Sequence, residues 1–271
     1  MKVVIVNDTD GPHFGCQLVM QSFREQLDRV GIELLGTVPK RVKSLDAYPD
    51  FVARADLVIV NGEGSIHHGK RGELIELATR YPAVLVNCVY QDNPARDALT
   101  EFRLVTARES RSAAALADHG VRARVIPDVI LSSRRLREAN RAADPEGLGI
   151  TDNVVDEGTD PGEDSVLLAK VGAGEAGRYL EGLGRYRGLA VGRFHTMLAA
   201  ASMGIPFAAW PSNTHKIEGA LEDMGVPELL APNREEAARR VPAEFDERIA
   251  AYVEDGRRKI DALFEELHEL A

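Results

Sequence analysis

Short apolar runs and amphipathic segments alternate along this chain, with polar, glycine-containing loops between them. A strand that is covered on both faces reads as a continuous run of Val, Ile and Leu, so each run predicts a strand of a parallel sheet. Hydrophobic residues three and four apart predict helices between the runs, as in residues 16–30 and 110–119. The expected strands lie near residues 3–7, 32–38, 57–61, 83–89, 103–107, 124–131, 165–171, 189–192 and 206–210.

This alternation of strand and helix predicts an α/β fold with parallel, doubly wound sheets. We expect a Rossmann-like N-terminal domain at residues 1–135 and a smaller, Rossmann-like, donor-binding domain at residues 165–243. Residues 136–164 contain a stretch rich in Asp, Glu, Gly and Pro, which predicts an acidic linker or excursion, with a short strand near residues 149–155. Residues 244–271 have the apolar spacing of one long helix that packs across the domains.

Composition narrows the class of protein. The chain has 271 residues, 44% of them hydrophobic, and a formal net charge of −10, which argues against a general nucleic-acid binder. No apolar run is long enough to span a bilayer, so we expect a cytoplasmic protein whose association with the inner membrane face would be peripheral. Cys16 and Cys88 are not spaced as metal ligands, and we expect reduced thiols and no metal. Composition leaves the oligomeric state open.

Two polar loops follow expected strands of the first half. Gly62, Gly64 and Ser65 surround Glu63 directly after the run at residues 57–61. Glycines at the carboxyl end of a parallel strand let a ligand approach the backbone, and Glu63 would then be a catalytic carboxylate. Asp8 and His13 follow the first run, where either could accept a proton from an acceptor hydroxyl. The alternative interpretation is a pair of solvent-facing turns whose polar side chains cap the backbone.

Arg108 and Asp128 follow the next expected strands in the same way. Arg108 stands two residues before Ser110, which can cap a helix, and Asp128 follows Pro127 after the first apolar residues of the run at 124–131. We expect Arg108 to contact an anionic donor and Asp128 to be either a catalytic carboxylate or a helix cap.

The segment from residue 192 to residue 216 carries the strongest candidate. Arg193 and His195 begin a helix of small residues, so a permanent charge, an imidazole and a helix N-terminus come together. This combination is typical of a phosphate or carboxylate site. The alternative is a core arginine that pairs with one of the many acids. A second polar cluster, which could hold another part of the same ligand, contains Ser212, Asn213, Thr214 and Lys216.

Several of these motifs, taken in order, resemble the polysaccharide pyruvyltransferase family over most of the chain. They read NGEGS at residues 61–65, TARES at 106–110, IPD at 126–128 and GRFHTMLAAASMGIPFAAW at 192–210, followed by the helix start that carries Lys216. The resemblance implies two Rossmann-like halves in a GT-B-like arrangement. It also implies transfer of a pyruvyl group from phosphoenolpyruvate to two hydroxyls of a sugar or lipid-linked glycan in surface-polysaccharide biosynthesis, without a further cofactor. Arg108, Arg193 and His195 would contact the donor.

The chain departs from that family at one informative position. Members commonly have three successive glycines where this chain has Gly62, Glu63 and Gly64. A carboxylate there also suits glycosyl transfer, and the chain resembles more faintly the transferases that use a CMP-activated sugar acid such as Kdo. Glu63 and Asp128 would then be a catalytic carboxylate pair, and His195 with residues 212–216 would hold the cytidylate phosphate. A non-catalytic sugar or nucleotide binder is the third alternative.

Overall fold

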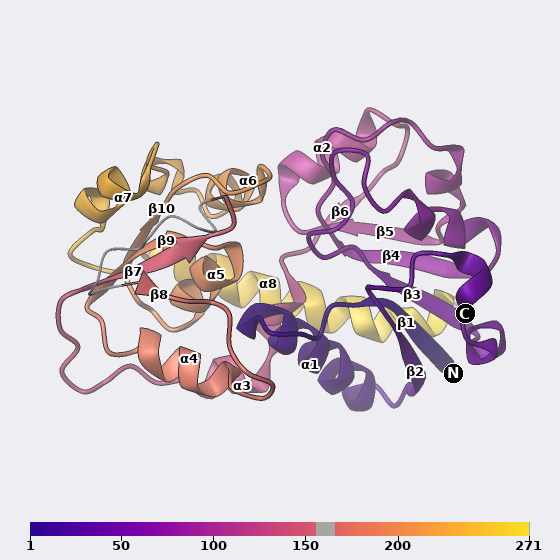
Figure 1. Ribbon diagram of the computed structural model, residues 1–271, viewed down its shortest axis with the longest axis horizontal. Coiled ribbons are helices and arrows are strands. Elements are labelled where there is room, and N and C mark those ends of the chain that lie inside the picture. The colour runs from indigo at the N-terminus through magenta and orange to yellow at the C-terminus, as the bar shows by residue number, and fades with distance from the viewer. Residues whose placement is uncertain (156–165, 271) are drawn as a thin grey trace. The chain divides into compact units, whose positions relative to one another are not determined.

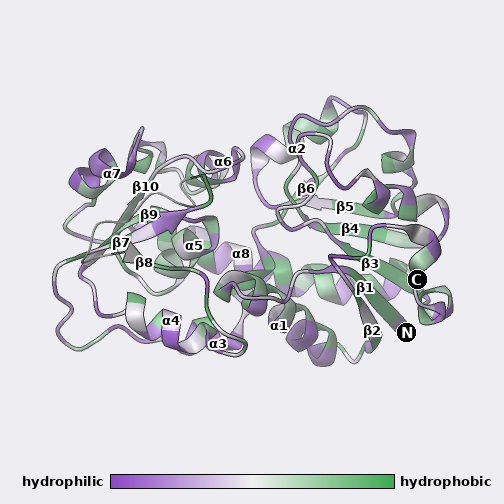
Figure 2. Cartoon of the chain, viewed as in Figure 1, coloured by the Kyte–Doolittle hydropathy of each residue, from purple (hydrophilic) through white to green (hydrophobic). Residues whose placement is uncertain are grey.

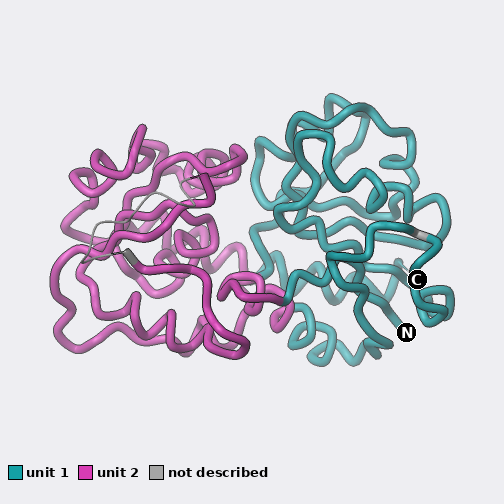
Figure 3. Tube along the Cα trace, viewed as in Figure 1, with its two compact units in different colours: residues 1–10, 23–129, 258–271 teal, residues 11–22, 130–257 magenta. Residues whose placement is uncertain are grey.

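A computed structural model describes residues 1–155 and 166–270 of the chain, which form two compact units. Unit 1 contains residues 1–10, 23–129 and 258–271, and unit 2 contains residues 11–22 and 130–257 (Figure 3). The α/β fold with parallel sheets is confirmed in both units, and so is the long C-terminal helix.

Unit 1 is built on a six-stranded parallel sheet of order β2-β1-β3-β4-β5-β6 (Figure 1). The strands β1, β3 and β4 are apolar because both of their faces are covered, and they stand out as hydrophobic ribbons in Figure 2. Val4, Val58 and Leu85 are among the fully buried side chains of its core. The strands are β1 (Lys2–Asp8), β2 (Glu33–Pro39), β3 (Leu57–Asn61), β4 (Ala83–Cys88), β5 (Leu104–Ala107) and β6 (Arg124–Val125).

Helices from three parts of the chain complete unit 1. Helix α2 (Ser110–Ala117) packs beside β5 and β6, and the side chain of Glu109 caps its first turn by accepting from the Ser112 amide at 2.9 Å. The second half of α1 (Phe14–Arg29) and the last turns of α8 (Glu247–Glu266) also belong to it. Phe23 of α1 and Phe264 of α8 meet edge to face with ring centroids 5.9 Å apart.

Unit 2 has a four-stranded parallel sheet of order β10-β9-β7-β8. Its strands are β7 (Leu148–Asn153), β8 (Val166–Leu167), β9 (Gly188–Gly192) and β10 (Phe207–Ala209). The helix α5 (Phe194–Ser202) is buried along nearly its whole length, because its small side chains allow close packing against β9 and β10. The other helices are α3 (Arg134–Glu138), α4 (Ala176–Leu183), α6 (Lys216–Asp223) and α7 (Arg234–Arg240).

Both sheets reverse their strand order once. In unit 1 the chain adds β2 on one side of β1 and β3 on the other, and in unit 2 it adds β8 on one side of β7 and β9 on the other. In open α/β sheets, ligands bind outside the carboxyl ends of the strands at such a switch point. The fold therefore marks the β1/β3 edge of unit 1 and the β7/β9 edge of unit 2 as the places to look for a site.

The expected domain boundaries differ from these units in three places. Residues 11–22, which are the loop before α1 and the first turns of that helix, group with unit 2 because their backbone and side chains bond to its loops. Residues 130–135 also group with unit 2. Strand β7 lies inside the expected linker at residues 136–164, of which residues 156–164 lie outside the described residues. No helix in the described stretches combines the length and the apolar character needed to cross a bilayer.

Candidate functional site

A buried polar cluster occupies the β1/β3 edge of unit 1. The amide of Asn7 donates to the carbonyl of Asn61 at 2.6 Å and to Ser65 Oγ at 3.1 Å. Thr9 donates its hydroxyl hydrogen to Glu63 Oε2, and Asn61 Nδ2 lies 3.5 Å from the same oxygen. Exposure falls from 9% for Thr9 and 4% for Glu63 to zero for both asparagines. Glu63 and Thr9 are therefore the members that a ligand would reach first.

Backbone strain is concentrated at the same edge. The non-glycine residues with positive φ in the described chain are Asn7, His68, Arg71, Asn87 and Asp92. All five stand at or shortly after the carboxyl ends of β1, β3 and β4. Left-handed conformations at non-glycine residues cost about 1–3 kcal/mol each and tend to gather at functional sites.

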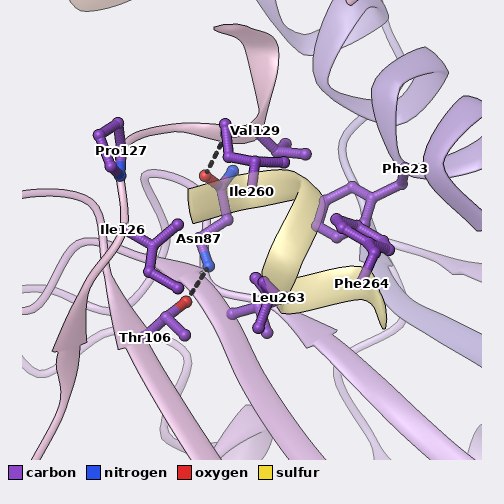
Figure 4. A pocket seen from close by; sticks show the side chains of 10 residues that line it. Phe23, Asn87, Thr106, Ile126, Pro127, Val129, Ile260, Leu263 and Phe264 are labelled. Atoms are coloured by element: carbon purple, nitrogen blue, oxygen red, sulfur yellow. Dashed lines mark hydrogen bonds between the residues drawn. The ribbon is translucent and has the colours of Figure 1, made fainter. Parts of the chain in front are cut away.

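The polar cluster at this edge has a second layer that sequence reasoning missed. Arg71 donates to Asn7 Oδ1 at 2.9 Å and to Glu73, and its buried Nη2 has no hydrogen-bond partner in the described part of the chain. Asn87 bridges from Asn61, 3.4 Å away, to the amide of Val129 at 3.1 Å. Figure 4 shows Asn87 with its bonds to Thr106 and Val129, beside the hydrophobic side chains of Ile260 and Leu263 of α8.

The two glycines beside Glu63 have different reasons to be glycine. A Cβ on Gly62 would lie 2.7 Å from Cys88 Cα, so the ends of β3 and β4 could not approach as they do. Gly64 has φ +50 and open space around it, which other residues adopt only with strain. Ser65, between the loop and Asn7, donates to the carbonyl of Glu63 at 2.8 Å.

Arg108 and Asp128 form a buried ion pair, and this corrects the roles that the sequence suggested for them. Arg108 Nη1 lies 2.6 Å from Asp128 Oδ2, and the two side chains are 1% and 0% exposed. A substrate cannot reach either group in this structure. The pair is better explained as internal support beneath the carboxyl edge of β5 than as a donor contact and a catalytic carboxylate.

Asp8 lies at the end of β1 but makes different contacts from the buried cluster. Its carboxylate accepts from the Asp10 amide at 2.9 Å and lies 3.5 Å from Arg24 Nη2. Its side chain is 11% exposed. Asp8 could accept a proton from a hydroxyl at the rim, which keeps it among the candidate bases.

In unit 2, Arg193 projects from the end of β9 and is held by Asp152 at the end of β7. Its Nη2 and Nε lie 2.5 Å and 3.1 Å from Asp152 Oδ2, a contact that sequence reasoning missed. Arg193 also stands at the N-cap of α5. The permanent charge is thus fixed at the β7/β9 switch point, beside the positive end of a helix dipole.

Two imidazoles accompany Arg193. His195 lies in the first turn of α5, and the ring of His13 meets it edge to face with centroids 6.0 Å apart. Burial, which is the largest cause, and the charges of His195, Arg193, Lys170 and Lys216, in that order, together lower the pKa of His13 to about 3. The sequence had placed His13 with the first domain, whereas the structure groups it with the cations of unit 2.

The loop after β10 carries the second polar cluster of the sequence to the same unit. Lys216 donates to Asn213 Oδ1, and Ser212 Oγ lies 3.4 Å from that oxygen. Thr214 is 4% exposed, and its hydroxyl makes no hydrogen bond to any residue that the structure describes. Asn153 of β7 holds the loop by donating to the Pro211 carbonyl at 2.9 Å. A buried hydroxyl without a partner is consistent with a ligand position.

The comparisons with known proteins bear on the fold alone. No protein-family model matches the chain, and no curated protein matches it. The fold resembles the crystal structure of a functionally uncharacterised protein from Klebsiella pneumoniae, KP1_0663, with a TM-score of 0.58 at 9% sequence identity. The match covers 86% of this chain and 93% of that one. Within the described residues, no group of three His, Cys, Asp or Glu side chains is arranged to hold a metal ion.

Proposed function

We propose that this chain is a transferase that moves a pyruvyl group from phosphoenolpyruvate to hydroxyls of a sugar or lipid-linked glycan in surface-polysaccharide biosynthesis. One observation carries the proposal. In unit 2, the ring of His13 meets that of His195 in the first turn of α5, and Arg193, Lys170 and Lys216 also lower its pKa through their charges. Phosphoenolpyruvate carries a phosphate and a carboxylate, and both groups are stabilised by such a set of donors.

Pyruvyl transfer requires two contributions from these side chains, which are stabilisation of negative charge and transfer of protons. A first hydroxyl oxygen bonds to C2 of phosphoenolpyruvate while C3 takes up a proton and becomes a methyl group. A second hydroxyl oxygen then displaces phosphate from C2, which yields the ketal and inorganic phosphate. The two hydroxyl protons balance the proton gained at C3 and the one that leaves with phosphate. Arg193 stabilises the departing phosphate, and His195 transfers the proton to C3.

Glu63 and Asp8 are the carboxylates that we assign to the acceptor hydroxyls. Glu63 already accepts a hydroxyl hydrogen bond from Thr9, which is the interaction that an acceptor hydroxyl would make. The glycosyltransferase alternative requires Glu63 and Asp128 to act as a reacting pair. Asp128 is fully buried against Arg108, so the geometry supports this alternative less well.

The test is phosphate release from phosphoenolpyruvate in the presence of a panel of sugar and glycan acceptors. We expect acceptor-dependent release, and a loss of about 10²–10³-fold in kcat for Arg193→Ala, as for removal of other charge-stabilising donors. Arg178→Ala is the matched control, because the Arg178 side chain is 79% exposed and, among the residues that the structure describes, pairs only with Glu175, at 2.8 Å. It should behave as the wild type does.

Other outcomes would point elsewhere. A melting temperature raised by CMP and unchanged by phosphoenolpyruvate would favour the glycosyltransferase alternative. Saturable binding of either ligand without turnover on any acceptor would favour a non-catalytic binder. Wild-type protein that neither binds phosphoenolpyruvate nor releases phosphate would overturn pyruvyl transfer.

A further inference from the structure

His13 is fixed by its own helix start in a way that determines which ring nitrogen carries the proton. The amide of Gly15 donates to His13 Nδ1 at 3.2 Å, so this nitrogen is an acceptor and carries no hydrogen. A neutral imidazole with an unprotonated Nδ1 has its hydrogen on Nε2. No described residue forms a hydrogen bond with Nε2. The ring therefore has one N–H donor, and no residue in the described part of the chain accepts from it.

The ring is held in place from two sides. It stacks on Phe14 with centroids 5.5 Å apart, and Phe14 in turn stacks on Tyr179 of α4 at 4.2 Å. On the other side it meets His195. Aromatic contacts of this kind and the Gly15 bond leave the imidazole little freedom to turn. The orientation of the Nε2–H group is thus set before a ligand arrives.

Positive charges from three segments of unit 2 oppose the protonation of His13. Arg193 and His195 contribute from the start of α5, Lys216 from α6 and Lys170 from the loop after β8. The positive end of the dipole of α1 adds to them, because His13 directly precedes that helix. Asp152, the acidic group beside Arg193, is already engaged by that side chain. His13 therefore stays neutral at neutral pH while its surroundings attract an anion.

We propose that His13 binds the anionic donor as a neutral imidazole, through a hydrogen bond from Nε2–H to a phosphate or carboxylate oxygen. The inference rests on the proposed donor site of unit 2 and assigns His13 a different role from that of His195. His195 transfers protons, whereas His13 orients and polarises the donor without titrating. A neutral histidine of lowered pKa at a helix start serves as an electrophile in other enzymes.

The test compares His13→Gln, which keeps a neutral N–H donor, with His13→Ala, which removes it. Binding of phosphoenolpyruvate and of inorganic phosphate is measured by calorimetry at pH 5.5, 7.0 and 8.0. We expect binding by His13→Gln within about twofold of the wild type and binding by His13→Ala weaker by about tenfold, the scale of one hydrogen bond to a charged group. His119→Gln is the matched control, because His119 lies in unit 1.

Nitrogen chemical shifts of labelled histidine report the protonation state and tautomer of His13, which distinguishes a hydrogen-bond donor from a residue that only supports the fold. We expect the neutral Nε2–H form of His13 at all three pH values, both with and without phosphoenolpyruvate. Proton uptake on binding that disappears in His13→Gln would overturn the proposal, and so would equal weakening by the Gln and Ala variants. If phosphoenolpyruvate fails to bind but inorganic phosphate binding depends on His13 as described, the proposed function fails and the neutral-donor role stands. If the protein turns over phosphoenolpyruvate and His13→Ala binds it as tightly as the wild type, the proposed function stands and the neutral-donor role of His13 fails.

Discussion

Gly15 and His195 are in direct contact, and the contact exists only because residue 15 has no side chain. A Cβ atom on Gly15 would lie 2.5 Å from His195 Cβ and closer still to Cγ and Nδ1 of the ring. Gly15 is in the first turn of α1 and His195 is in the first turn of α5, and both belong to unit 2. This contact brings two helix starts and two imidazoles together at the β7/β9 edge.

Gly15→Ala should therefore damage both stability and anion binding. The added methyl group must displace the His195 ring or the first turn of α1, and overpacking of this kind costs about 1–3 kcal/mol. We expect a lower melting temperature and weaker binding of inorganic phosphate, measured by thermal melts and calorimetry on the same preparation.

Gly182→Ala is the matched control for that substitution. Gly182 lies in α4, and a Cβ there would have Leu167 Cδ2 as its nearest neighbour at 4.0 Å. Alanine is better than glycine in a helix by about 0.5–1 kcal/mol, so this variant should be at least as stable as the wild type. If Gly15→Ala is as stable as Gly182→Ala and binds phosphate equally well, the packing argument is wrong.

Asp128→Ala should lower the stability of the folded protein and leave the activity of the folded molecules almost unchanged. Asp128→Ala removes the carboxylate that lies 2.6 Å from the buried Arg108, and breaking a buried pair in this way costs about 3–5 kcal/mol. The free energy of unfolding, from denaturant titration, measures this cost. Activity per folded molecule should remain close to the wild type, because neither group can reach a substrate.

The double variant Arg108→Met, Asp128→Leu separates support of the fold from chemistry. Apolar side chains of similar volume often replace a buried ion pair without loss, so this variant should be more stable than Asp128→Ala. A stable double variant with no activity would restore the catalytic role that the sequence indicated for Asp128.

Glu63→Gln should affect use of the acceptor and leave donor binding unchanged. The amide keeps the volume of the carboxylate but loses its charge and its capacity to accept a proton at neutral pH. We expect acceptor-dependent phosphate release to fall by about 10²–10⁴-fold, the usual contribution of a general base. Binding of phosphoenolpyruvate should not change, because its proposed site lies in unit 2.

Glu101→Gln is the control for the Glu63 variant. Glu101 is an exposed carboxylate of unit 1 in the turn at Asp97–Glu101, and we assign it no part in binding or catalysis. It should retain full activity. Normal phosphate release by folded Glu63→Gln would remove Glu63 from the mechanism.

The sequence predicts most elements of this fold because their signals are local, but the strands expected at residues 124–131 and 165–171 are wrong beyond the two residues each of β6 and β8. The runs at residues 57–61 and 83–89 are strands almost to the residue, and the apolar spacing after residue 244 is the helix α8. Strand order is not a local property, so the two switch points emerge only when the parallel pairings are known. The short strand expected near residues 149–155 is β7, which lies at the centre of its sheet rather than in a linker.

The candidate sites show the same difference between local features, which the sequence predicts, and long-range features, which it does not. Residues next to each other in a motif, such as Arg193 and His195, could be read from the sequence because one helix start carries both. Partners distant in sequence could not, and Asp152 with Arg193 is the clearest example at 41 residues apart. The sequence also does not show which side chains are buried, and the burial of Arg108 is what changes its interpretation. An arginine at a strand end reads the same whether it faces solvent or an internal carboxylate.

His13 should make the folded state less stable in acid, and the sign follows from its lowered pKa. Folding lowers the pKa of His13 from 6.5 to about 3. Between these two values the unfolded chain binds a proton at residue 13 that the folded chain does not bind, so acid favours unfolding. This destabilisation is absent above about pH 6.5, where both states are unprotonated at residue 13, and it grows as the pH falls toward 3.

His13→Gln cannot titrate and should lack this component. We expect the free energy of unfolding of the wild type to fall more steeply than that of His13→Gln between pH 7 and pH 4.5, with the two curves parallel above pH 7. Urea titrations at intervals of half a pH unit measure the difference, and His119→Gln corrects for the loss of a histidine as such. Parallel curves throughout would mean that His13 titrates normally, and a steeper fall for His13→Gln would mean that the ring is stabilised as an imidazolium.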